Sequence, residues 1–278
     1  MTPRLGVALG SGGARGIVHL SYIEAIEELG LVPTLIAGTS MGALLGAGWA
    51  SGMPGRELRE YVSQVVTPRE LAGRLWTSGS KSLRQFGPSW QIDTARIVES
   101  YLPASIPPTF DGLKIPLLAI ATDYFKAEQT VFSSGPLLPA LSASLAIPGV
   151  FRPIRIGDNV YIDGGATNPL PADHLREAVD VIVAIDVNGQ ISEPPAGTIE
   201  PGLFDVGFGA MQIMTRGLTL SVLRRAKPEV YVQAPVSAFR VLEFWRSEEI
   251  LAEGDKQKDA FKRHLTKAIE RAERRALA

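Results

Sequence analysis

Apolar runs of strand length recur along the chain, and segments with helical spacing separate them. The runs lie at residues 5–9, 33–37, 115–122, 181–187 and 229–233. Two of them, 115–122 and 181–187, are continuously apolar, as expected for strands that are covered on both faces. The segments 57–66 and 93–101 have the spacing of helices. Strands that alternate with helices favour a mostly parallel sheet between two helical layers, so we predict an α/β fold, a three-layer α/β/α sandwich.

We expect residues 1–278 to form a single domain, in which 191–278 supplies C-terminal helices, the late strand and a candidate lid. The segment 204–223 is the nearest approach to a membrane span. It contains Asp205, Arg216 and several glycines, which a spanning helix does not normally carry. The pattern therefore predicts a buried or lid-like helix there, preceded by a mobile loop rich in Pro and Gly at 191–203.

The last predicted helix, which begins near Asp255, is basic and amphipathic. It contains eight basic and four acidic residues, and its apolar positions repeat at helical spacing. Such a helix either docks its apolar stripe on the domain or lies on an anionic membrane surface. We favour docking and keep the membrane as the alternative.

Composition and charge narrow the class of protein. Hydrophobic residues make up 45% of the chain and charged residues 21%, which is ordinary for a globular protein. The net charge of −1 gives no reason to expect nucleic acid as a partner. The absence of cysteine excludes disulfides, a cysteine nucleophile and thiolate metal sites. With no signal-peptide pattern at the N-terminus, we expect a cytoplasmic protein.

A serine turn is the first candidate for chemistry. Residues 38–42 read Gly-Thr-Ser-Met-Gly and directly follow an apolar run. A serine between Gly38 and Gly42, at the end of a strand and the start of a helix, has the pattern of a nucleophile elbow. Glycines allow the close backbone approach of such a turn. The Ser40 hydroxyl would then lie at a helix N-terminus, where developing negative charge is favoured. The pattern indicates acyl transfer, although the pentapeptide alone also arises by chance.

A glycine-rich turn, residues 10–16, closes the first predicted strand. The backbone N–H groups of Gly12, Gly13 and Ala14 can point into one concavity and form an oxyanion hole. Dinucleotide binding is the rival interpretation, because such turns also cradle pyrophosphate. The spacing here is Gly-x-Gly-x-x-x-Gly, one residue longer than the dinucleotide fingerprint, and no acidic residue ends the second strand. We therefore favour the oxyanion hole.

The base is harder to assign, because none of the three histidines is convincingly placed. His19 is expected to be a hydrogen-bonded core residue, His174 lies at a helix start, and His264 lies on the charged C-terminal helix. Asp163 ends an alternating strand and precedes two glycines, which makes it the better candidate. A carboxylate is a weak base in water. Partial desolvation and a short hydrogen bond to Ser40 would strengthen it.

Together these motifs carry a family resemblance. The turns at 10–16 and 38–42 and the Asp-Gly-Gly sequence at 163–165 have the order and spacing of the patatin-like phospholipases. The segments 121–123 and 142–153 are similar to that family as well. The resemblance extends over roughly residues 4–190.

The resemblance implies a Ser–Asp dyad, with Ser40 as nucleophile and Asp163 as base, and neither a metal nor a cofactor. It assigns the oxyanion hole to the glycine-rich turn. Other residues that match the family's motifs are Gly10, Arg15, Gly16, Gly38, Gly42 and Gly165. Ser11 departs from the pattern, since many relatives have glycine there; its N–H remains available.

Family members hydrolyse phospholipids, lysophospholipids and other acyl lipids. We therefore expect an acyl-ester lipid as partner, no nucleic acid, and transient contact with a membrane surface at its cytoplasmic face. The 77–91 and 204–223 segments are expected to line the acyl channel. Two other hypotheses stay open, namely an enzyme that binds nicotinamide or flavin and a catalytically silent lipid-binding protein. The natural lipid and the oligomeric state do not follow from the sequence.

Overall fold

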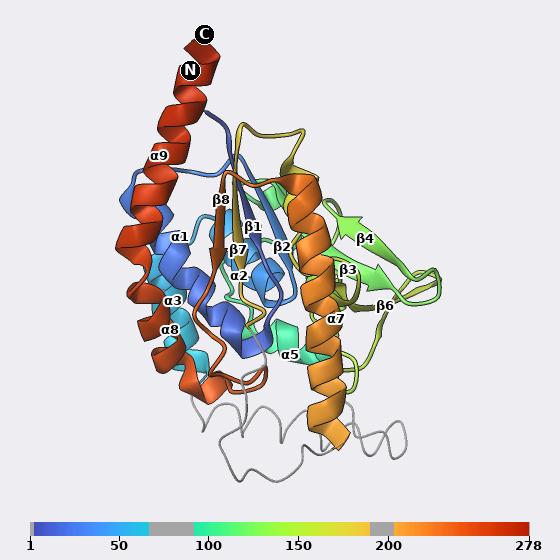
Figure 1. Ribbon diagram of the computed structural model, residues 1–278. Helices are drawn as coiled ribbons and strands as arrows, with labels where there is room; N and C mark the ends of the chain where they lie inside the picture. Colours follow the sequence, from blue (N-terminus) through green and yellow to red (C-terminus); the bar gives the residue numbers. More distant parts are fainter. Residues whose placement is uncertain (1–2, 67–91, 190–202, 278) are drawn as a thin grey trace, which may run out of the picture.

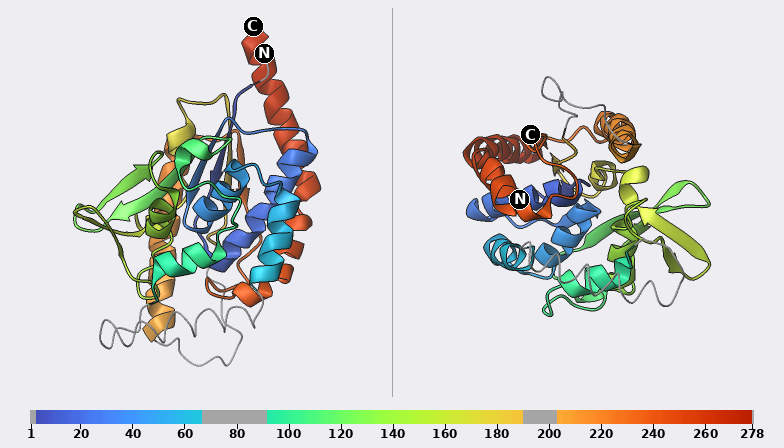
Figure 2. Two further views of the ribbon diagram at one scale, coloured as in Figure 1. Left: turned by 180° about the vertical axis from the view of Figure 1, so that it is seen from behind. Right: turned by 90° about the horizontal axis from the view of Figure 1, so that it is seen from below.

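The chain folds around one central sheet with helices on both faces (Figures 1 and 2). The computed structural model describes residues 3–66, 92–189 and 203–277. The irregular stretch at 77–91 and the loop predicted at 191–203, apart from its last residue, lie outside these ranges.

The sheet has eight strands in the order β5-β6-β3-β2-β1-β7-β8, and β4 also pairs with β3. The strands are β1 (Leu5–Leu9), β2 (Leu35–Thr39), β3 (Leu117–Asp123), β4 (Glu128–Phe132), β5 (Ile154–Ile156), β6 (Asn159–Asp163), β7 (Val181–Asp186) and β8 (Val230–Gln233). The path from β3 through β2, β1 and β7 to β8 is parallel throughout. The pairings of β4, β5 and β6 are antiparallel. The sheet is therefore mostly parallel, as predicted.

Two strands that approach from opposite directions share one edge of β3. Thr39 of β2 lies opposite Ile120, and Asp163 of β6 lies opposite the next residue, Ala121. β4 pairs with this part of β3 from the other side. Because β2 is parallel to β3 and β6 is antiparallel, the carboxyl ends of β2 and β6 meet. The sheet thus brings the turn at Ser40 next to Asp163.

Helices form a layer on each face of the sheet. The helices that share the larger core are α1 (His19–Glu28), α2 (Met41–Ala50), α3 (Gly55–Val65), α5 (Thr94–Tyr101), α6 (Leu137–Ser144), α8 (Ser247–Asp255) and α9 (Lys258–Leu277). The other face is covered by α7 (Leu203–Ala226) and the segment 170–179. Figure 1 shows α7 and α9 on opposite sides of the strands. This arrangement confirms the predicted three-layer α/β/α class.

The two cores explain why the central strands lack an alternating polar pattern. In β7, Val183 and Ile185 enter the larger core, whereas Ile182 and Ala184 enter the smaller one. Side chains on a strand point to alternate faces, and here both faces are covered. The run is therefore apolar at every position from Val181 to Ile185, which is how it was recognised in the sequence.

The helix and strand boundaries differ from the predictions mainly near the two turns. β1 has the predicted bounds, but β2 lies two residues later than 33–37 because it continues through Gly38 up to the serine turn. The first helix, α1, starts only at His19, because Gly13–Val18 forms a 3₁₀ turn before it.

The C-terminal helix α9 docks on the domain, the alternative favoured above. Phe261 and Leu265 are buried, and the Phe261 ring meets the edge of Tyr22 on α1 at a centroid distance of 5.2 Å. Lys258 and Lys262 form ion pairs with Glu28 at the end of α1. One face of the helix is therefore held by both apolar and charged contacts.

Of the two alternatives predicted for 204–223, a buried or a lid-like helix, the buried one is wrong. The helix α7 is present and longer, but it is not buried all round, because Ile213 and Met214 are each 64% exposed. Its buried side packs on the sheet through Val222 and Ala226. Among the described residues, no helix has both the length and the hydrophobicity needed to cross a bilayer.

Candidate active site

Ser40 lies in a strained turn between β2 and α2. Its φ of 56° and ψ of −122° fall in a region that side-chain-bearing residues rarely adopt, which is the backbone signature of a nucleophile elbow. Gly42 makes the turn feasible, since a Cβ at this position would lie 2.1 Å from the carbonyl oxygen of Leu9. The serine is only 3% exposed. The elbow predicted from the sequence is therefore formed.

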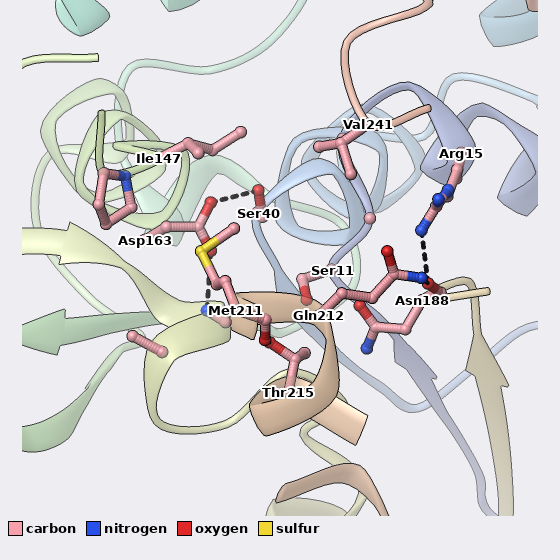
Figure 3. Close-up of a pocket in the computed structure, with 15 residues that line it drawn as sticks. Ser11, Arg15, Ser40, Ile147, Asp163, Asn188, Met211, Gln212, Thr215 and Val241 are labelled. Carbon is pink, nitrogen blue, oxygen red and sulfur yellow. Dashed lines mark hydrogen bonds between the residues drawn. The ribbon is translucent and has the colours of Figure 1, made fainter. Parts of the chain in front are cut away.

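The Ser40 hydroxyl donates a hydrogen bond of 2.6 Å to Oδ2 of Asp163. Figure 3 shows the two side chains pointing toward one another. The other carboxylate oxygen accepts the N–H of Gly165 at 2.7 Å. Burial raises the pKa of Asp163 from 3.8 to about 6, although the bonds from Ser40 and Gly165 lower it. The carboxylate is thus ionised at neutral pH and is a stronger base than an exposed aspartate.

Ser144, which the sequence analysis did not single out, braces the elbow. Its Oγ accepts the backbone N–H of Ser40 at 2.8 Å and donates to the carbonyl of Ile120 at 2.6 Å. On the other side of the turn, Thr39 donates to the carbonyl of Asn168 at 2.8 Å. These side chains attach the strained turn to β3 and to the segment after β6. Ser144 lies within the 142–153 segment noted above, but its role there depends on a contact that the sequence does not encode locally.

The glycine-rich turn approaches the serine with two free donors. Ser11 N–H is bound by the carbonyl of Pro169, and Ala14 N–H is bound at 2.8 Å by the carbonyl of Val241. Within the described part of the chain, the N–H groups of Gly12 and Gly13 have no acceptor. The prediction that Ala14 contributes to the oxyanion hole is therefore corrected, because its N–H is already engaged. Gly12 and Gly13 remain as candidate donors.

His19 forms a buried contact with the glycine-rich turn. It is completely buried, and its Nε2 lies 2.9 Å from the carbonyl oxygen of Gly10. Burial lowers the pKa of its imidazole to about 4, so it is neutral at physiological pH. The predicted core histidine is confirmed. The other two histidines lie outside the pocket: His174 contacts Gln129, and His264 is on α9.

Arg15 is held away from Ser40 by backbone carbonyls. Its Nε donates to Phe239 and its Nη1 to Asn188, each at 2.6 Å. Burial lowers the pKa of the guanidinium, an effect that the charge of Glu243 partly offsets. Figure 3 shows the bond to Asn188 at the far side of the pocket from Asp163. The arginine therefore joins the glycine-rich turn to the chain that follows β7 and β8.

A small cavity of about 60 Å³ opens between these elements. Its wall has apolar side chains near Ser40 and polar ones toward Arg15. The residues that line it are Ser11, Gly12, Gly13, Arg15, Ser40, Ile147, Pro148, Asp163, Gly165, Ala166, Asn188, Met211, Gln212, Thr215 and Val241. Three of these come from α7, which was expected to line a channel, and Val241 comes from the loop after β8. Ser40, Asp163, Gly12 and Gly13 therefore all border one small space.

Comparison with known proteins identifies relatives over much of the chain. The sequence model of the family described as patatin-like phospholipase matches residues 7–176. An uncharacterized NTE family protein of Mycobacterium tuberculosis is 34% identical over 209 residues, which cover 73% of this chain and 54% of that protein. The lysophospholipase NTE1 of Pyricularia oryzae is 27% identical over 278 residues. The match covers 91% of this chain and 18% of that protein. The chain therefore spans about half the length of the mycobacterial protein and a still smaller share of NTE1.

Solved structures with the same fold have much lower sequence identity. VipD from Legionella pneumophila matches with a TM-score of 0.51 and 15% identity, over 94% of this chain and 67% of that one. Human GIVD cytosolic phospholipase A2, in complex with methyl gamma-linolenyl fluorophosphonate, matches with a TM-score of 0.53 and 14% identity, over 98% and 59%. These likenesses concern the fold. The match of the family's sequence model to residues 7–176 and the 34% identity to the mycobacterial protein show that the chain belongs to the patatin-like phospholipase family.

Proposed function

We propose that the protein is a serine hydrolase that cleaves carboxylic esters of lipids through a Ser40–Asp163 dyad. The observation that carries the proposal is the 2.6 Å hydrogen bond from Ser40 to Asp163. Beside it lie the backbone N–H groups of Gly12 and Gly13, which have no acceptor among the described residues. A nucleophile, a base within hydrogen-bond reach and an oxyanion site are the three parts that acyl transfer requires.

In the first step Ser40 Oγ attacks the ester carbonyl carbon while Asp163 Oδ2 takes the hydroxyl proton. The carbonyl oxygen becomes an oxyanion, which accepts the N–H groups of Gly12 and Gly13. One such donor typically stabilises the transition state by about 3 kcal/mol. The N-terminus of α2, which begins directly after the serine, adds a favourable dipole. Collapse of the intermediate breaks the ester bond, and the leaving alcohol takes the proton from Asp163.

In the second step a water molecule attacks the acyl-enzyme. Asp163 accepts a proton from this water, and the same two N–H groups hold the second oxyanion. When the intermediate collapses, the Ser40 oxygen leaves and recovers the proton from Asp163, which releases the fatty acid. A base with a pKa of about 6 suits both directions of transfer at neutral pH.

An acyl lipid is the substrate class that the site favours. Ile147, Pro148, Met211 and Val241 give the cavity an apolar wall, which suits the first apolar carbons of an acyl group next to the reacting carbonyl. One relative has the name lysophospholipase, and a structural neighbour is a phospholipase A2. We propose phospholipids or lysophospholipids as substrates, acted on in the cytoplasm at a membrane surface.

The test is hydrolysis of p-nitrophenyl butyrate by matched variants. Ser40→Ala and Asp163→Ala should each lose activity by at least a factor of about 1,000. Asp158→Ala, which removes an exposed carboxylate from the turn between β5 and β6, should behave as wild type. An Asp163→Ala variant with near-normal activity would show that another group is the base.

A catalytically silent lipid-binding protein is the competing function, and covalent labelling separates the two. A fluorophosphonate reacts with an activated serine, so wild-type protein should gain one adduct at Ser40. The Ser40→Ala variant is the control and should gain none. An unlabelled wild-type protein that still binds lipid would favour the silent function.

A further inference from the structure

The middle turns of α7 have the opposite polarity to an ordinary surface helix, whereas its C-terminal turns bury Val222 and Ala226 in the usual way. In its middle turns, Thr215 and Thr219 are buried against the domain and Gln212 donates to the carbonyls of Asn188 and Gly189. The opposite side carries large apolar side chains in contact with solvent. Surface helices normally place the apolar side inward and the polar side outward. The outward apolar side of α7 therefore requires an explanation beyond folding.

The exposed residues form a continuous stripe. Val206 is 53% exposed, Leu220 is 43% exposed, and Ile213 and Met214 lie between them at 64%. The full outer stripe consists of Val206, Ala210, Ile213, Met214, Gly217 and Leu220. Spacings of three and four residues keep these positions on one side of the helix. At a rise of 1.5 Å per residue the stripe extends over about 21 Å.

Two exposed arginines border the stripe. Arg216 lies at its edge and Arg224 at its C-terminal end. Among the described residues, neither forms an ion pair with a carboxylate, although the charge of Arg216 acts on the buried Asp186 and partly offsets the rise that burial causes in the pKa of that carboxyl. The neighbouring Arg225, in contrast, is paired with Asp173 at 2.9 Å. Exposed cations beside an exposed apolar stripe match the boundary between anionic lipid headgroups and acyl chains.

The stripe is also continuous with the candidate active site. Met211, which follows Ala210 of the stripe, lines the cavity together with Gln212 and Thr215 (Figure 3). One side of α7 therefore faces Ser40 and the other faces solvent. A surface that binds the outer side would lie beside the cavity that receives the substrate.

From this geometry we propose that the outer stripe of α7 is the surface by which the protein binds an anionic lipid bilayer. The inference rests on the proposed function, because hydrolysis of lipids is the reason to expect a lipid surface next to α7. The helix lies parallel to the membrane with Ile213 and Met214 among the acyl chains and Arg216 and Arg224 at the phosphates. Binding by this stripe delivers lipid next to α7 and the cavity.

The experiment measures sedimentation with vesicles, using Ser40→Ala protein so that the lipid stays intact. The stripe variant is Ile213→Gln with Met214→Gln, since glutamine preserves the helix and both side chains are exposed. On vesicles of phosphatidylcholine and phosphatidylglycerol, it should bind roughly tenfold more weakly or worse. The matched control, Val32→Gln with Leu277→Gln, removes two apolar side chains elsewhere that are even more exposed, and it should bind normally.

A second variant tests the charges. Arg216→Gln with Arg224→Gln should lose roughly tenfold or more in binding to the mixed vesicles. On vesicles of pure phosphatidylcholine it should bind as the unsubstituted protein does. Equal loss on both kinds of vesicle would show that the arginines do not recognise anionic lipid and would overturn that part of the proposal.

Three results would overturn the whole proposal: no vesicle binding by the unsubstituted protein, equal binding by the stripe variant, or a dimer in light scattering that the stripe variant dissociates. The last result would assign the stripe to a second copy of the chain. Hydrolysis of soluble p-nitrophenyl butyrate, measured with Ser40 present, should be unchanged in the stripe variant. An inactive wild-type protein would contradict the proposed function, while the vesicle data would still decide the role of the stripe.

Discussion

Replacing Asp163 with asparagine should abolish hydrolysis and at the same time stabilise the fold at neutral pH. Asparagine preserves the shape of the side chain. Its Oδ1 can accept the Gly165 N–H, which the carboxylate accepts at 2.7 Å. Its Nδ2 can donate to Ser40 Oγ, because a hydroxyl accepts as well as donates. The variant therefore loses the charge and the base without leaving a buried polar group unpaired.

The size of the gain follows from the pKa of the carboxyl. Burial raises this pKa from 3.8 to about 6, and a difference of one pKa unit corresponds to about 1.4 kcal/mol. The ionised carboxylate therefore lowers the free energy of unfolding by roughly 3 kcal/mol at pH 8. Domains are stable by only about 5–15 kcal/mol in total, so the effect is large enough to measure.

The gain depends on pH in a defined direction. Between the unfolded pKa of 3.8 and the folded pKa of about 6, the folded protein keeps a proton on Asp163 that the unfolded chain has lost. The wild-type protein therefore gains stability as the pH falls through about 6, whereas the asparagine variant does not. The advantage of the variant should be complete at pH 8, about half as large at pH 5, and almost absent below 3.8.

Urea unfolding followed by tryptophan fluorescence at pH 8 and pH 5 measures this difference, because the chain has four tryptophans. Asp158→Asn, an exposed site, serves as the control and should change stability by less than about 0.5 kcal/mol. A gain of the same size at both pH values, or none at pH 8, would refute the inference that the Asp163 carboxylate is desolvated. Retained hydrolysis would refute its role as base.

Two further predictions concern the same turn. In wild-type protein, kcat/KM for p-nitrophenyl butyrate should fall about tenfold per pH unit below about pH 6. The reason is that Asp163, with its raised pKa, becomes protonated in this range and can no longer accept the serine proton. A decline that begins only near pH 4 would contradict the raised pKa. Ser144→Ala should cost about 1–3 kcal/mol and lower kcat more than it raises KM, because it leaves the Ser40 N–H unpaired. Ser142→Ala is the matched control on α6, since that hydroxyl donates only to Leu138 of its own helix; equal kcat losses in the two variants would argue against a role of Ser144 in the turn.

The fold was predictable because its central strands are covered on both faces. The run 181–187 has no polar alternation, and the structure places its residues in two separate cores. The elbow was predictable as well, since Gly42 must let the carbonyl of Leu9 approach within van der Waals contact. Both signals depend on a local requirement for a particular residue type. Such requirements are written into short stretches of sequence.

The remaining features depend on contacts between distant segments. The carbonyl of Val241 accepts the N–H of Ala14, more than 200 positions away in the sequence. Ser144, on α6, accepts the N–H of Ser40. Neither residue has a local pattern that sets it apart from other loop or helix residues. The exposed side of α7 was missed for a different reason. Its apolar composition resembles that of a buried helix, and only the packing of Thr215 and Thr219 reveals which side faces inward.

The topology of the sheet places an aspartate where the proposed dyad needs its base. An aspartate side chain is short, so its backbone has to come close to the serine. β2 and β6 end opposite consecutive residues of β3, and this register fixes both backbones before either side chain is placed. The same close meeting of strand ends buries the carboxylate, and this burial raises the pKa of Asp163 toward neutrality. Proximity and basicity therefore have one structural cause, the convergence of two strands on one edge of β3.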